Sequence, residues 1–222
     1  MISRRTSLAA VLCSLELAAG VGRAGTNTWT GGGSSSNASE AANWSGGIPA
    51  AGDTILLDLT STKNLIWNAG SNGLPDTVAA WIQTTDYTGT VTFDTRFPGQ
   101  GAFTNFTISG DCIVSNGTWT HIANPGGETA VRRLQVTIGG NLRLASNATF
   151  TVDGLGFRGY CGPGKPDGGG GQQHGAAHGG LGGLMGGAGS SGTVYGSPCN
   201  PGTLGSGGGR SDSPNAAGGG AI

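Results

Sequence analysis

Charged side chains are scarce in this sequence. Aspartate, glutamate, lysine and arginine make up 10% of its 222 residues, and the 11 basic and 12 acidic residues give a formal net charge of −1. An average soluble protein has about 25% charged residues. Nucleic-acid-binding domains carry an excess of basic side chains, because these displace counterions from phosphates. The sequence therefore excludes nucleic acid as a partner, and the low charge argues against disorder driven by charge repulsion.

Long apolar runs are lacking too. None approaches the ~20 residues that a membrane-spanning helix requires, so we expect no transmembrane segment. The N-terminus has the three parts of a secretory signal: the basic pair Arg4 and Arg5, the short apolar stretch 8–15, and small residues over 22–24. Residues 1–24 are therefore predicted to be a signal peptide, and the mature protein to be secreted or exposed on the outer cell surface. A core helix or a twin-arginine export signal is the alternative interpretation.

The sequence has only four cysteines, and one of them, Cys13, falls in the signal segment. In an oxidising compartment the remaining three allow at most one disulfide. Cys161 and Cys199 lie on either side of the most glycine-rich stretch, so a bond between them would close a loop that has little other stabilisation. We expect this pair to form the disulfide and Cys112 to point inward as a small apolar side chain. Three unpaired, buried thiols are the alternative.

Glycine, by contrast, is abundant, with 47 residues. Residues 25–153 are rich in Thr, Val, Ile, Phe and Trp, whereas residues 154–222 are dominated by glycine and have few large apolar side chains. We interpret this second part as a partly irregular excursion, ordered by close backbone packing that only glycine permits. A disordered linker is the alternative. The last residues, 216–222, resemble the start of a new strand, so we expect a fragment of a longer protein, truncated at the C-terminus.

Short alternating runs between Gly, Asn and Asp residues predict β-strands throughout the first part. The block from Thr107 to Thr120 is repeated 30 residues later, from Thr137 to Thr151, with one inserted residue, and a looser copy covers 81–93. A unit this small cannot bury its apolar face alone, so neighbouring copies must stack. The strands are expected at 54–59, 90–94, 106–109, 136–138, 141–144 and 148–152.

These features predict an all-β fold: a right-handed parallel β-helix, or solenoid, with Asn and Gly at its tight corners. Residues 25–153 would form its coils and an N-terminal cap. An antiparallel sandwich also has short strands and frequent turns, and it is the alternative. In the solenoid, the inward side chains of one copy lie over those of the next. The expected inward residues are Ile108, Cys112, Val114 and Trp119 in one copy and Ile138, Leu142, Leu144 and Phe150 in the next.

Several motifs resemble those of a known class of proteins. Residues 28–33 (TWTGGG), 42–49 (ANWSGGIP) and 52–55 (GDTI) resemble the start of bacterial secreted β-helix proteins of the autotransporter-passenger-like and polymorphic-outer-membrane-like kinds. The glycine-rich runs at 175–180 and 204–209 are similar to a glycine-rich module of such proteins. The resemblance implies a large exported protein that is associated with the cell surface, often without a known activity.

The titratable residues predict no catalytic, metal or cofactor site. The carboxylates do not form the neighbouring pairs that acid–base catalysis of glycoside cleavage needs. Asp94 near Arg96, and Asp111 near Arg132 or Arg133, are interpreted as charges at the corners of coils. A second candidate pair, residues 174 and 178, consists of histidines at zinc-like spacing, but the glycine around them opposes the helix on which this spacing works.

The last hypothesis about a site concerns two aromatic side chains. Trp29 and Trp44 are candidates for stacking on the sugar rings of an extracellular polysaccharide, with core packing as the other interpretation. The sequence as a whole predicts a secreted or cell-surface structural or adhesive solenoid without catalytic activity, whose partner is a polysaccharide or a cell surface. One alternative is a carbohydrate-active enzyme, a polysaccharide lyase or hydrolase with its catalytic coils outside this sequence. The other is a carbohydrate-binding module.

Overall fold

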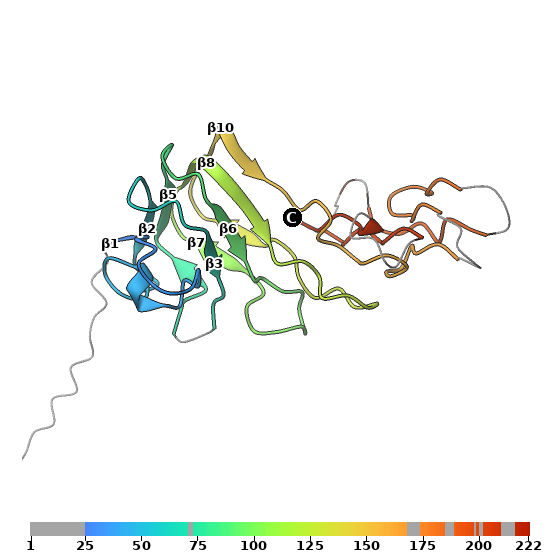
Figure 1. Ribbon diagram of the computed structural model, residues 1–222, viewed down its shortest axis with the longest axis horizontal. Coiled ribbons are helices and arrows are strands. Elements are labelled where there is room, and N and C mark those ends of the chain that lie inside the picture. Colours follow the sequence, from blue (N-terminus) through green and yellow to red (C-terminus); the bar gives the residue numbers. More distant parts are fainter. Residues whose placement is uncertain are drawn as a thin grey trace, which may run out of the picture.

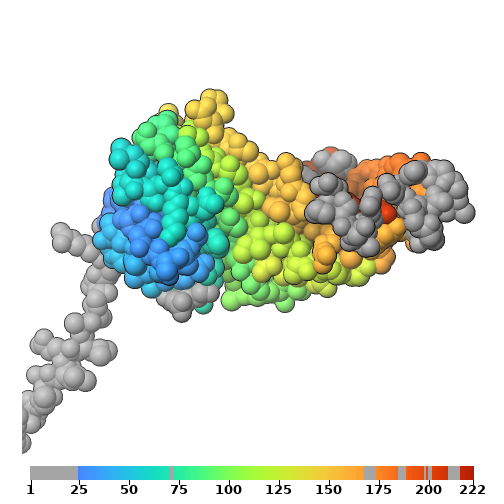
Figure 2. All heavy atoms as spheres, in the orientation of Figure 1, coloured from blue at the N-terminus to red at the C-terminus, as the bar shows by residue number. Residues whose placement is uncertain are grey.

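Figure 1 shows the computed structural model of the chain. The structure describes residues 25–70, 73–167, 174–184, 189–197, 199, 202–209 and 216–222. The signal peptide predicted over residues 1–24 lies outside these ranges. Within them, no helix is both long and apolar enough to cross a membrane. The molecule is elongated, with the strands at one end and the glycine-rich segments at the other (Figures 1 and 2).

The described residues form short strands that pair in parallel. One sheet has the order β1-β2-β5-β8-β6-β3, with β10 beside β8, and the other has the order β4-β7-β9. Strands far apart in the chain are neighbours, because each coil brings the chain back beside the previous one. The elements are β1 (Thr26–Thr28), η1 (Ala41–Asn43), β2 (Thr54–Leu57), β3 (Leu65–Trp67), β4 (Thr77–Val78), β5 (Ala80–Gln83), β6 (Thr90–Phe93), β7 (Phe106–Ile108), β8 (Cys112–His121), β9 (Val136–Ile138) and β10 (Leu142–Phe150).

Every second side chain of a strand points into the solenoid. In β2, β5 and β6 the second and fourth residues are buried, whereas the first and third are only partly buried. The ladder register places these inward side chains above one another, as in the stack formed by Leu65, Val91, Trp119 and Phe150. The resulting column of about four turns confirms the predicted parallel solenoid. The antiparallel sandwich is wrong, since the paired strands run in the same direction.

The 30-residue repeat is the spacing between successive coils. Thr107 is the ladder partner of Thr137, and Cys112 is the partner of Leu142. The register shifts by one residue between Leu144 and Asn147, where the inserted residue of the second copy forms a bulge. The two strands predicted over 141–152 are therefore a single strand, β10, that follows β8 along most of its length.

The last described coil, formed by β9 and β10, is less buried than the coil beneath it. The four inward residues predicted in the first copy of the repeat are fully buried. Their counterparts Ile138 and Phe150 are only partly buried, and Leu142 and Leu144 are 48% and 50% exposed. All four occupy the predicted ladder positions. About half of the surface of each leucine nevertheless remains exposed to solvent.

Extended segments of the glycine-rich part are held together by backbone hydrogen bonds. The amide of Gly156 donates to the carbonyl of Gly218 at 2.8 Å, and the amide of Phe157 donates to the carbonyl of Gly205 at 3.0 Å. A Cβ atom on Gly156 or Gly218 would overlap a neighbouring carbonyl oxygen, so the segments approach this closely only because these positions are glycine. The described part of this region is thus ordered by backbone packing, with a small apolar cluster of Phe157, Leu204 and Ala221.

The segment 216–222 returns to the solenoid (Figure 1). The amide of Gly220 donates to the carbonyl of Val152 at 2.7 Å, and the carbonyl of Ala221 accepts from the amide of Leu134 at 2.8 Å. Gly220 also lies against the ring of His121, so closely that a Cβ atom there would overlap Nε2. The glycine-rich part therefore leaves and rejoins the solenoid at the same corner of the last described coil.

Candidate functional site

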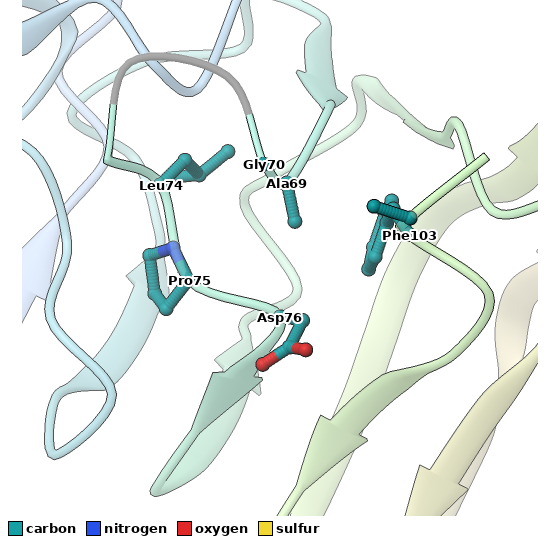
Figure 3. A pocket seen from close by; sticks show the side chains of 7 residues that line it. Ala69, Gly70, Leu74, Pro75, Asp76 and Phe103 are labelled. Carbon is teal, nitrogen blue, oxygen red and sulfur yellow. The ribbon is translucent and has the colours of Figure 1, made fainter.

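A groove lies between two loops that project from neighbouring coils. One loop joins β3 to β4 and the other joins β6 to β7. The groove has two lobes of about 250 and 170 Å³ that share lining residues, and Figure 3 shows the larger one. We call it the loop groove. Its lining residues are Asn68, Ala69, Gly70, Leu74, Pro75, Asp76, Asp94, Arg96, Gly101, Ala102 and Phe103.

Backbone hydrogen bonds tie together the described residues on either side of each loop. The amide of Gly70 donates to the carbonyl of Leu74 at 3.2 Å, and the amide of Arg96 donates to the carbonyl of Phe103 at 2.8 Å. The indole N–H of Trp67, a core residue, donates to the carbonyl of Pro75 at 3.0 Å and ties the first loop to the solenoid. The walls of the groove are therefore held in place by the same coils that build the core.

Apolar side chains form the walls of the larger lobe. Leu74 and Phe103 are nearly buried and stand on opposite sides of the space in Figure 3, with Ala69 between them. Asp76, which begins the return into β4, supplies a carboxylate at the edge of the same lobe. The lobe thus combines an apolar interior with one acidic group.

One carboxylate and two guanidinium groups meet beside the smaller lobe. Asp94 Oδ2 accepts a hydrogen bond from Arg96 Nη2 at 2.9 Å, and Asp94 Oδ1 accepts one from Arg132 Nε at 2.8 Å. The predicted proximity of Asp94 and Arg96 is confirmed. The contact between Asp94 and Arg132 was missed. It depends on the loop between β8 and β9, which folds back so that the backbones of Arg132 and Arg96 form an antiparallel β-bridge. The side chains of Arg96 and Arg132 are 33% and 21% exposed.

The two tryptophans predicted to stack on sugars lie in the core. Trp29 is 0% and Trp44 is 5% exposed. Their rings meet edge to face with centroids 5.0 Å apart, and their indole N–H groups donate to the carbonyls of Lys63 and Ala38. The glycan-stacking hypothesis is therefore wrong for both residues, since neither ring offers a face to a ligand. They belong to the hydrophobic core of the solenoid.

The cysteines of the described residues are free thiols. Cys112 is buried as expected, and its burial raises the pKa of the thiol to about 12. Cys161 is half-buried against the apolar cluster around Phe157, whereas Cys199 is exposed. The expected Cys161–Cys199 disulfide is therefore not formed in this structure, where one thiol packs on an apolar cluster and the other faces solvent.

The other titratable candidates do not form a common site. Asp111 accepts from the amide of Asn141 at 2.8 Å, rather than from an arginine. His178 contacts the Thr203 hydroxyl through Nε2 at 3.0 Å, and the ring of Tyr195 lies edge-on at 4.8 Å. Across the part of the chain that the structure describes, no three His, Cys, Asp or Glu side chains come together as a group that could hold a metal ion.

Comparisons of the chain with protein-family models, with curated proteins and with solved structures find no match. The arguments about function therefore come from the solenoid and the loop groove themselves. Arg96 and Asp94 line the smaller lobe, Asp76 lines the larger one, and Ala69, Ala102 and Phe103 line both. Such an arrangement suits the binding of a small ligand with both polar and apolar faces.

Proposed function

We propose that this chain is an exported structural or adhesive protein that acts outside the cell or on its surface without catalysis. The signal pattern over residues 1–24 supports export. The motifs at 28–33, 42–49 and 52–55, which resemble those of bacterial surface β-helix proteins, support the same location. A solenoid suits such a role, because stacked coils create an extended lateral surface from a short repeat.

The non-catalytic part of the proposal is supported by the hydrogen bonds that the carboxylates accept within the fold. The carboxylate of Glu40 accepts hydrogen bonds from the amides and hydroxyls of Ser34 and Ser35. Asp53 Oδ2 accepts from the amide of Ala50 at 2.9 Å. Carboxylates that are occupied by their own turns serve the fold rather than a substrate. Asp58 is engaged by its own turn in the same way, and other carboxylates accept hydrogen bonds from more distant parts of the fold: Asp94, Asp111, Glu128 and Asp167.

Export is tested by expressing the full chain in a bacterial host, separating the cell fractions and sequencing the N-terminus of the product. We expect an exported protein that begins at or near Gly25. A Leu12→Asp variant, which places a charge in the apolar stretch of the signal, is the control and should stay unprocessed in the cytosol. A cytosolic product with residues 1–24 intact would overturn the proposal.

The absence of catalysis is tested separately on the purified protein. Polymers of uronic acids and of neutral sugars are incubated with it, and new reducing ends and unsaturated products are measured against a heat-denatured sample. We expect the two samples to agree. Turnover that disappears when the protein is denatured would show that the chain is an enzyme and contradict this part of the proposal.

A further inference from the structure

Three stacked strands repeat one motif, in which two threonines flank an inward apolar residue. The motif occurs at 90–92 in β6, at 118–120 in β8 and at 149–151 across the end of β10. These strands are neighbours in the sheet and lie side by side in Figure 1. Successive side chains of a strand point to opposite faces, so both threonines of each motif point outward. We call these six side chains the threonine grid: Thr90, Thr92, Thr118, Thr120, Thr149 and Thr151.

The ladder register lines the threonines up in two rows that run across the strands. In the first row, Thr118 is the partner of Thr90 on one side and of Thr149 on the other. The second row holds the next outward residue of each strand, and Thr151 belongs to it because its amide donates to the carbonyl of Trp119 at 3.0 Å. Neighbouring strands lie ~4.8 Å apart, and successive outward residues of a parallel strand lie about 6.6 Å apart. The grid therefore has a regular spacing in two directions.

The hydroxyl groups of the middle strand are available to bind water. Thr118 and Thr120 are partly exposed, and their hydroxyls form no hydrogen bond within the part of the chain that the structure describes. The threonines of the other sheet differ in this respect. The Thr137 hydroxyl donates to Asn105 Oδ1 at 3.0 Å, and the Thr107 hydroxyl accepts from Asn105 Nδ2 at 2.9 Å. Only the grid thus combines a regular spacing with free hydroxyls in its central strand.

The side chains of the grid select an uncharged, periodic partner. Threonine carries no charge, and the aromatic residues of the same strands, Phe93, Trp119 and Phe150, point inward and pack in the core cluster. The grid therefore offers neither an ion-pair partner nor a ring that could stack on a sugar. Each threonine presents a methyl group and a hydroxyl with one donor and two acceptor lone pairs. Water held at regularly spaced hydroxyls is itself regularly spaced.

We propose that the threonine grid binds the surface of ice. Water molecules in the prism face of hexagonal ice repeat, in two perpendicular directions, over distances similar to the two spacings of the grid. Waters bound at the hydroxyls and held apart by the methyl groups can therefore join the crystal. A bridging water is nearly as favourable as a direct hydrogen bond, so a row of such waters holds the protein on the ice. This inference goes beyond the proposed function and names a partner for one face of the solenoid.

The test measures how the purified protein partitions when ice grows slowly through its solution. Solutes without affinity for ice are left in the remaining liquid. We expect the protein to be enriched in the ice at least tenfold relative to lysozyme dissolved in the same sample. Recrystallisation of a thin layer of ice crystals, followed by microscopy at a constant temperature, should also slow when the protein is added.

Two variants locate the binding on the grid. Thr118→Tyr places a bulky ring at its centre, and tyrosine is well accommodated in strands, so the enrichment in ice should fall at least tenfold in a folded protein. Thr92→Lys introduces a charge from the neighbouring strand and should cause a similar loss. The matched control is Thr107→Tyr, which makes the first substitution at a partly exposed position of β7 in the other sheet and should leave the enrichment unchanged.

Several results would overturn the inference. These are exclusion of the parent protein from ice, equal losses for Thr118→Tyr and Thr107→Tyr, or undiminished enrichment of Thr92→Lys. Retention on microcrystalline cellulose together with exclusion from ice would assign the grid to a polysaccharide surface instead. Circular dichroism and the unfolding temperature of each variant establish that it is folded. Because export is measured on cell fractions, an exported protein that is excluded from ice would refute the grid assignment alone.

Discussion

The rings of Trp119 and Phe150 are stacked face to face, with centroids 4.9 Å apart and planes 1° from parallel. The two residues are ladder partners in β8 and β10, on successive coils. Trp119 also meets Trp81 and Phe93 edge to face, with centroids 5.4 and 4.9 Å away. The stacked pair therefore joins the last described coil to the aromatic column inside the solenoid.

Replacing Trp119 by alanine should strongly destabilise the protein. The side chain is fully buried, and removing a buried large aromatic residue typically costs about 3–5 kcal/mol. Phe150→Ala should cost less, because Phe150 is only partly buried. The free energies of unfolding in urea, measured for both variants and the parent, test this order. A larger loss for Phe150→Ala would contradict the position of Trp119 at the centre of the column.

The glycine-rich part should be sensitive to alanine only at the positions where backbones meet. A Cβ atom on Gly218 would overlap the carbonyl of Gly205, whereas Gly219 has nothing within 4 Å of the same added atom. Gly218→Ala should therefore lower the hydrogen-exchange protection of the Gly156 amide, which donates to Gly218, at least tenfold. Gly219→Ala is the matched control and should leave that amide protected. Equal effects of the two substitutions would refute backbone packing as the source of order.

His121 should make the solenoid less stable in mild acid. Burial lowers the pKa of its ring, the hydrogen bond between Nδ1 and the Ile122 carbonyl opposes this, and the positive charge of Arg132 lowers the pKa further. The folded state therefore binds its proton at a lower pH than the unfolded state does. The stability is fully present above pH ~6.5, the unfolded pKa, and is lost as the pH falls towards the folded pKa.

A His121→Gln variant isolates this contribution from the other histidines. Between pH 7 and 5 the parent should lose more free energy of unfolding than the variant, by at most about 1.4 kcal/mol per pH unit. The amide of Gly220, which lies against His121, should lose exchange protection in acid in the parent only. Identical pH profiles for the two proteins would show that the ring is not buried against this segment.

The stabilising contribution of Glu40 should be lost in strong acid. Hydrogen bonds from the Ser35 hydroxyl, the Ser35 amide and the Ser34 amide lower its pKa from 4.5 to about 2. The stabilisation is therefore present above pH ~4.5 and lost as the pH falls towards 2. Glu40→Gln should lower the unfolding temperature at pH 7 and make little difference at pH 2. A difference that persists at pH 2 would contradict this role.

The sequence was informative about the fold because the repeat itself encodes the coil. Matching Thr107 with Thr137 already gave the ladder register, and the aligned apolar positions gave the inward side chains. Strand β3 was missed, because its three residues Leu65–Trp67 are too few to show alternation. The exposure of Leu142 and Leu144 was also missed, since a repeat pattern specifies which way a side chain points but not whether another coil covers it.

The loop groove could be predicted only in part. The nearness of Asp94 and Arg96 followed from their spacing in the chain, but Arg132 arrives from a different coil and has no sequence signal that links it to them. Asp76 and Phe103 also meet only through the stacking of two loops. The hypothesis that two tryptophans stack on sugar rings failed for a related reason. Composition shows that Trp29 and Trp44 are present, but only the fold shows that they are buried.

The central claim, that the repeats form parallel coils in a fixed register, is tested most directly by engineered disulfides. Thr118 and Thr149 are ladder partners, whereas Arg143 is the partner of Ile113. Neighbouring strands lie ~4.8 Å apart, which is within the range that a disulfide spans. With the native cysteines replaced by alanine, Thr118→Cys/Thr149→Cys should cross-link on mild oxidation and Thr118→Cys/Arg143→Cys should not. Cross-linking of the second pair in place of the first would mean that β8 and β10 are not stacked in parallel.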